Sequence, residues 1–85
     1  MKNIIETNYQ SIKKRGLITP RTTKCDFIMK LEEEVQEFID AESKQDKAEE
    51  LADVILVCLN YAKHYGINIE KQLLLNITKN QTRHD

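Results

Sequence analysis

The sequence predicts an all-α protein, and three observations support this. The 85 residues include only one Pro and two Gly, and residues that favour helices recur throughout. Apolar residues recur at spacings of three and four along four segments. Residues typical of helix starts and stops separate these segments. We therefore expect a single domain over residues 1–85 that forms a four-helix bundle. Because a core of this size is only marginally stable alone, we expect dimerisation to complete it.

The first helix is expected over residues 3–15, with four apolar residues on one broad side: Ile4, Ile5, Tyr9 and Ile12. Gly16 acts as a stop signal. A loop follows, because Pro20 disfavours helix at the residue before it, and a threonine near Lys24 is available as the next N-cap.

The second helix is expected over residues 24–42. Its apolar residues fall within about a third of the circumference: Phe27, Ile28, Leu31, Val35, Phe38 and Ile39. Glu34 lies at the margin of this face, and Glu37 lies further round on the same side. A half-buried, unpaired carboxylate is unusual at such a position.

The third helix is expected over residues 46–65, ended by Gly66 in a left-handed conformation. Between residues 51 and 59 only Asp53 is not apolar, so we expect this helix to be central and covered on most sides. A narrow polar stripe contains Glu49, Asp53, Asn60 and His64, with Glu50 on its flank. A charged residue in such a segment needs a partner or a ligand.

The fourth helix is expected over residues 69–82, with Asn68 as its N-cap. Its apolar residues predict a buried face: Ile69, Leu73, Leu74 and Ile77. Asn76, Lys79 and Arg83 share one edge of this helix.

Composition narrows the functional classes. The net charge is −1, whereas a general nucleic-acid binder is usually more basic, so we expect no nucleic-acid partner. Most acidic residues lie between residues 32 and 53, which points to cations. Cys25 and Cys58 show no metal-motif spacing and are expected to be free thiols in a reducing compartment. The longest apolar run is too short to span a bilayer, so we expect a cytoplasmic protein without a membrane partner.

Two acidic pairs at helical spacing carry the chemistry: Glu34 with Glu37, and Glu50 with Asp53. If the second and third helices form a hairpin with its turn near Ser43 and Lys44, Glu37 comes level with Glu50, and Glu34 with Asp53. Four carboxylates then converge, which requires a cation or protons between them.

Carboxylates suit a hard divalent ion, so we expect Mg²⁺, with Mn²⁺ as the alternative. Di-iron bundles use Glu-x-x-His pairs, and neither His64 nor His84 has a glutamate three residues before it. The competing interpretation is an ordinary acidic helix surface, on which Lys30 pairs with Glu34 and Lys47 with Glu50. The symmetry about the turn and the position of Asp53 favour the metal site.

The pattern Glu33-Glu34-x-x-Glu37 followed by Glu50-x-x-Asp53, within EELADVI, resembles the MazG-type all-α nucleoside triphosphate pyrophosphohydrolases. The resemblance covers residues 16–83. It implies a magnesium-dependent hydrolase that splits a nucleoside triphosphate into monophosphate and pyrophosphate and removes unwanted nucleotides. It also implies a homodimer or a dimer of dimers.

The resemblance implies a role for each matching residue. Four would be metal ligands: Glu34, Glu37, Glu50 and Asp53. Glu33 would support the site or position water, although Glu33, Glu34 and Glu37 are all open as the general base. Asn60, Lys79 and Arg83 would contact the substrate, or Lys79 and Arg83 would be solvated cations near a helix end. Because the chain is short and lacks Trp to stack on a base, the alternative function is a non-catalytic helical dimer that binds nucleotide or a protein partner.

Overall fold

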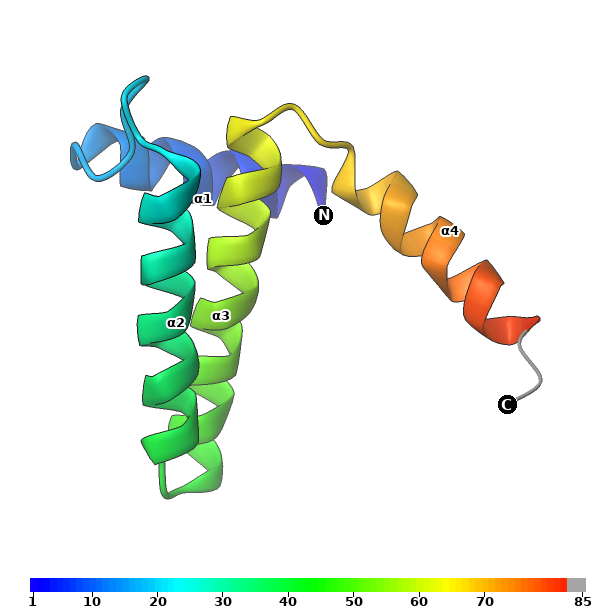
Figure 1. The fold of residues 1–85 in the computed structure, drawn as a ribbon. Coiled ribbons are helices and arrows are strands. Elements are labelled where there is room, and N and C mark those ends of the chain that lie inside the picture. The colour runs from blue at the N-terminus through cyan, green and yellow to red at the C-terminus, as the bar shows by residue number, and fades with distance from the viewer. Residues whose placement is uncertain (83–85) are drawn as a thin grey trace.

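The computed structural model describes residues 1–82 as four helices (Figure 1). They are α1 (Lys2–Lys14), α2 (Lys24–Asp40), α3 (Lys44–His64) and α4 (Ile69–Gln81). The predicted all-α class is confirmed, and the described residues form no strand. The largest deviation from the predicted bounds is at the hairpin, where α2 ends and α3 begins two residues earlier than expected.

Local signals explain where the helices begin and end. The Thr23 hydroxyl accepts from the Asp26 backbone N–H at 3.2 Å, and the Asp26 carboxylate accepts from the Thr23 N–H at 2.8 Å, which completes a capping box. Ser43 and Asn68 cap α3 and α4 through their side-chain oxygens. Gly16 and Gly66 follow α1 and α3 with φ of 76° and 67°, a left-handed conformation in which a side chain would be strained.

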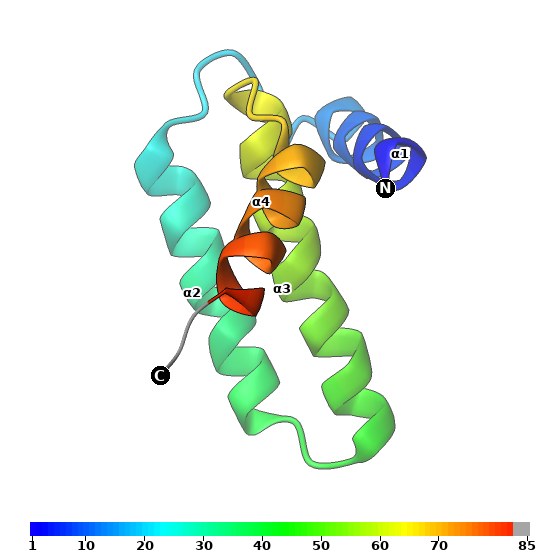
Figure 2. The same cartoon turned by 90° about the vertical axis from the view of Figure 1, so that its right-hand side faces the viewer.

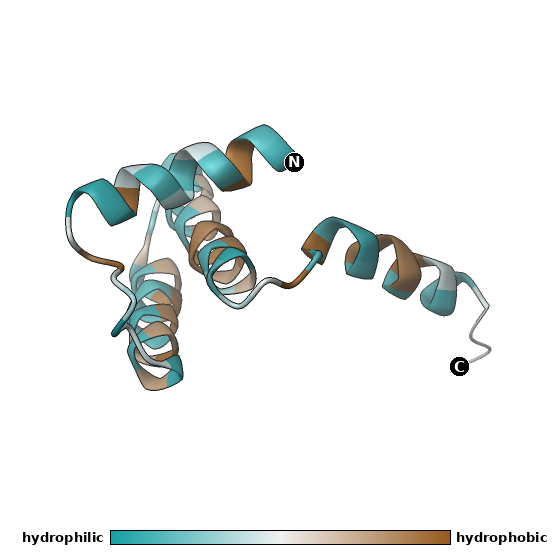
Figure 3. Cartoon of the chain, turned by 90° about the horizontal axis from the view of Figure 1, so that it is seen from above, coloured by the Kyte–Doolittle hydropathy of each residue, from teal (hydrophilic) through white to brown (hydrophobic). Residues whose placement is uncertain are grey.

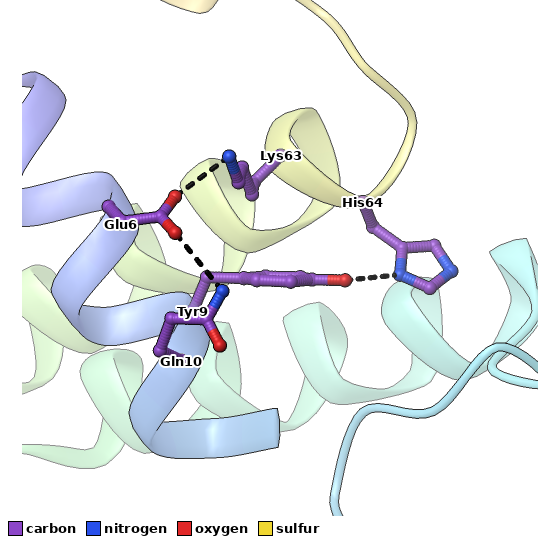
Figure 4. Close-up of polar contacts among 5 residues, drawn as sticks. All are labelled: Glu6, Tyr9, Gln10, Lys63 and His64. Carbon is purple, nitrogen blue, oxygen red and sulfur yellow. Dashed lines mark hydrogen bonds and ion pairs between the residues drawn. The ribbon is translucent and has the colours of Figure 1, made fainter. Parts of the chain in front are cut away.

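Helices α2 and α3 pack side by side as an antiparallel hairpin (Figure 1 and Figure 2), and α1 crosses α3 near the open end of that hairpin (Figure 1). Three polar contacts bring α1 and α3 together, two of which are drawn in Figure 4. Lys63 pairs with Glu6 at 2.7 Å, and the Tyr9 hydroxyl hydrogen-bonds His64 Nδ1 at 3.0 Å. Asn8 and Asn60 form the third contact. The hydrogen bond from Lys63, with a second from Gln10, lowers the pKa of Glu6.

The core lies where α1, the following loop and the open end of the hairpin meet. Its buried apolar residues are Ile18, Phe27, Leu59 and Ala62. The Phe27 ring packs against aromatic rings of α3, with centroid distances of 5.1 Å to His64 and 5.5 Å to Tyr61 in an edge-on arrangement.

Two burial expectations, for α4 and for α3, are wrong for the single chain. Helix α4 stands apart from the other helices (Figure 3), and every residue from Glu70 to its end is exposed, so its predicted face at Ile69, Leu73, Leu74 and Ile77 is not buried. Helix α3 is not covered on most sides, since Leu51 and Ile55 are exposed. On α2 only Phe27 is buried among the predicted apolar residues, and Ile39 is 61% exposed. These residues form the apolar faces that the sequence pattern predicts, but a single copy of the chain leaves much of their surface exposed. None of the described helices has the length and apolar character needed to cross a membrane.

Candidate metal centre

The hairpin brings the four predicted carboxylates together. Oxygen atoms of Glu34, Glu50 and Asp53 lie within 4.8 Å of one another, and so do those of Glu33, Glu34 and Glu37. Glu34 belongs to both groups, so it is the centre of the cluster. The contacts follow from the register of the hairpin, since α2 and α3 pack along their length with the turn at residues 41–43.

Two oxygens of the cluster are buried without a partner. Glu34 is 7% exposed, and no N–H or hydroxyl group of the described residues donates to its Oε2 or to Glu50 Oε2. A buried carboxylate oxygen without a donor is costly. Two such atoms from opposite helices form a donor set that fits a hard divalent cation. The residues present therefore fit the ion that the carboxylate pattern predicts.

The crowding of carboxylates perturbs Glu37. A hydrogen bond with Glu34, together with the charges of Glu34 and Glu50, raises the pKa of Glu37 from 4.5 to about 7. Like charges at this distance disfavour a second ionised group, which is why the carboxyl proton of Glu37 is held more tightly.

Lys30 supplies the positive charge nearest to this centre. Its ammonium lies 3.0 Å from Glu34 Oε1 and 3.6 Å from Glu33 Oε1. The hydrogen bond with Glu34 raises the pKa of Lys30. This is the pair expected for an ordinary acidic surface, but it engages only Oε1 of Glu34. The opposite oxygen, which is buried, stays unpartnered, so Lys30 does not complete the site.

A cavity of about 650 Å³ opens beside the cluster. This volume lies in the range of roughly 300–1,000 Å³ that is usual for small-molecule sites. Glu33, Glu34 and Asp53 line one part of it, and Leu56 and Val57 line an apolar stretch of α3. An acidic end with apolar walls can accept a ligand that carries both charge and a ring.

The remaining predicted site residues are placed as follows. Asp53 is exposed and lines the cavity, from which the partner or ligand expected for it could approach. Asn60 is buried and lines the same cavity. Lys79 lies on α4 and does not line the cavity, because α4 stands away from the hairpin. Arg83 lies outside the described residues.

The cavity is also lined by residues that were not predicted as site residues from the sequence, among them Asn8 and Arg15. Asn8 is a polar residue of α1, and the Arg15 cation follows the end of that helix. Together with Ile12 they are spaced by four and three residues, so they share one face of the helix. That spacing was readable from the sequence, but only the crossing of α1 over α3 shows that this face borders a cavity.

Fold and site together define a helical protein with an acidic pocket suited to a divalent ion and a charged small molecule. The model of the MazG nucleotide pyrophosphohydrolase domain matches residues 23–85. This match covers most of the chain, which therefore belongs to the MazG family. Searches among curated proteins and among solved structures found no match.

Proposed function

We propose that this protein is a Mg²⁺-dependent nucleoside triphosphate pyrophosphohydrolase. It would cleave the bond between the α and β phosphates with one water molecule, releasing a nucleoside monophosphate and pyrophosphate, and so remove unwanted nucleotides. Family membership supports the reaction class. The single observation that carries the proposal is the pair of buried oxygens without a donor on Glu34 and Glu50, two residues of opposite helices whose carboxylates come within 4.8 Å of each other.

In this proposal Glu34, Glu37, Glu50 and Asp53 hold the metal. Bound there, Mg²⁺, or Mn²⁺ in its place, supplies positive charge to the triphosphate and makes a water molecule more acidic. Glu34 is fixed by burial, which keeps its carboxylate in one orientation without reorganisation.

The proposed catalytic residues are Glu33 and Glu34. Glu33 is exposed at the cavity, and its pair with Lys30 is a long one of 3.6 Å. Its carboxylate can therefore leave Lys30, turn toward water and accept a proton. Lys30 would then be available to a phosphate oxygen.

Lys79 and Arg83 are proposed substrate contacts. Lys79 does not line the cavity of the single chain, and Arg83 lies outside the described residues. We propose that a second copy covers the exposed apolar residues of α3 and α4, as a homodimer or a dimer of dimers, and that Lys79 reaches the site in that assembly. Exposed Leu51, Ile55 and Leu74 supply apolar surface for such an interface. A cytoplasmic location also stays a prediction.

The test is pyrophosphate release from a panel of common and modified nucleoside triphosphates, with Mg²⁺ and then with chelator. We expect metal-dependent release and one monophosphate per pyrophosphate. Glu50→Gln should abolish turnover, whereas Glu49→Gln, its exposed neighbour on α3, should retain it. The absence of release at enzyme concentrations near that of the substrate, or equal activity in the two variants, would refute the proposal.

The second candidate is a non-catalytic helical dimer that binds nucleotide or a protein partner. The exposed apolar residues of α4 favour it, because they offer a docking surface that needs no chemistry. Tight binding of a triphosphate without turnover under every metal condition would support this candidate over the enzyme.

A further inference from the structure

The cavity has a second polar end, formed by two carboxamides. Asn8 of α1 donates from Nδ2 to Oδ1 of Asn60 on α3 at 2.8 Å. Both residues line the cavity. Asn60 is only 6% exposed, yet this is its one side-chain hydrogen bond among the described residues. A carboxamide has two N–H donors and one acceptor oxygen, so Asn60 keeps unused donors and Asn8 keeps an unused acceptor.

This pair lies at a useful distance from the acidic cluster. Asn60 follows Asp53 by seven residues on α3, which is two helical turns or about 10 Å. Leu56 and Val57 line the cavity between them, and Ile12 of α1 lines it from the neighbouring helix. The Arg15 cation also lines the cavity, but it follows Asn8 by seven residues, which is about 10 Å along α1. The cavity thus has carboxylates in one part, an apolar stretch beside them, and a neutral carboxamide pair that both donates and accepts. A nucleotide has the same order of parts: phosphates, then a ring with apolar faces and a polar edge.

We infer that Asn8 and Asn60 together recognise the edge of the nucleobase, with Asn8 as a specificity-determining residue supplied by α1. The inference rests on the proposed function for the identity of the ligand. It goes beyond that function because α1 lies outside the matched residues 23–85. A neutral donor and acceptor side by side complement a base edge, which also presents donors and acceptors. A phosphate presents only acceptors and negative charge, so it can use the N–H groups of the pair but leaves the Asn8 carbonyl oxygen facing another acceptor.

The hydrogen bond between the two carboxamides makes them a unit. Because Asn8 holds Oδ1 of Asn60, the Asn60 amide is oriented and its N–H₂ group is directed elsewhere. Fixing a buried polar group before binding reduces the entropy lost when the ligand is bound. Removing the Asn8 side chain therefore loses one contact directly and frees the other to reorient.

The test measures binding rather than turnover. Calorimetry with Mg²⁺ would compare α,β-imido analogues of the four common nucleoside triphosphates with inorganic tripolyphosphate, which has no base. For Asn8→Ala we expect affinity for the preferred nucleotide to fall about fivefold to tenfold, as for one or two neutral hydrogen bonds. The differences among the four bases should narrow, and affinity for tripolyphosphate should stay within about twofold of its original value.

Asn3→Ala is the matched control, because Asn3 is an exposed residue of the same helix and does not line the cavity. It should leave every affinity unchanged. If Asn8→Ala lowers the melting temperature, Asn8→Leu restores side-chain volume without the amide and should show the same loss of base preference. An equal loss for all four bases, a parallel loss for tripolyphosphate, no loss at all, or no nucleotide affinity in the unmodified protein would overturn the inference. Binding that follows the prediction in a protein without turnover would refute the proposed enzyme while leaving the role of Asn8 intact.

Discussion

Replacing Lys30 with methionine tests whether the ammonium and the metal compete for the same carboxylates. In the metal-free protein Lys30 lies 3.0 Å from Glu34, whose side chain is only 9% exposed, while the Lys30 side chain is 52% exposed. Solvent screens a pair of this kind, so Lys30→Met should destabilise the metal-free protein by about 1 kcal/mol. For a domain of this size that corresponds to a melting temperature lower by about 4–8 °C.

The same change should strengthen metal binding. If Mg²⁺ takes over the role of the ammonium, the metal-bound forms of the two proteins are equally stable. The metal-free variant is then less stable by about 1 kcal/mol while the metal-bound form is unchanged, so the affinity of the variant for Mg²⁺ should rise about fivefold. Thermal unfolding with and without saturating Mg²⁺, together with calorimetric titration, measures both sides of this cycle. Lys24→Met, an exposed lysine of the same helix, should change neither quantity. Equal destabilisation with and without Mg²⁺, at unchanged affinity, would refute the competition.

Three further predictions follow. The pKa of Glu37 is raised from 4.5 to about 7 in the folded state, so protonation of Glu37 stabilises the metal-free protein. Its free energy of unfolding should therefore fall as pH rises from about 4.5 through 7. Saturating Mg²⁺ should remove this fall, and a free energy of unfolding that rises with pH would contradict the prediction. Asp53→Asn should lose Mg²⁺-dependent turnover yet leave metal-free stability equal or higher, since it removes a repelling charge; a lower melting temperature would reveal a structural partner of Asp53. Ile77→Glu on exposed α4 should shift the molecular mass in sedimentation equilibrium from that of a dimer or tetramer to that of a monomer. Gln72→Glu, which changes a polar residue on the same helix, should leave the mass unchanged. An unchanged mass in Ile77→Glu would mean that α4 lies outside the interface.

Local features of the sequence were enough to predict the helices. Thr23, Asn68 and Gly66 mark helix ends through hydrogen bonds or backbone angles that involve only neighbouring residues, so the bounds could be derived from local chemistry. The convergence of Glu34 with Glu50 followed from the hairpin alone, because a short turn fixes the register of two antiparallel helices.

Other features depend on contacts that local patterns do not encode. The apolar residues of α4 predicted a buried face, but periodicity shows only that a face needs covering and not which surface covers it. Asp53 was expected to need a partner or a ligand because of its apolar neighbours in sequence, but only the packing of the helices shows that it lines a cavity. The contact between Asn8 and Asn60 joins residues 52 positions apart, and it depends on how α1 crosses α3.

The most direct test of the account is a Mn²⁺ titration followed by electron paramagnetic resonance, in which the signal of free Mn²⁺ reports the ion that stays unbound. The account predicts that the unmodified protein and Glu49→Gln remove the free signal alike, that added Mg²⁺ restores it by competition, and that Glu50→Gln weakens binding by at least about tenfold, as for a lost charged ligand. Retained binding in Glu50→Gln, or no binding in the unmodified protein, would contradict the claim that the two helices share a metal ion.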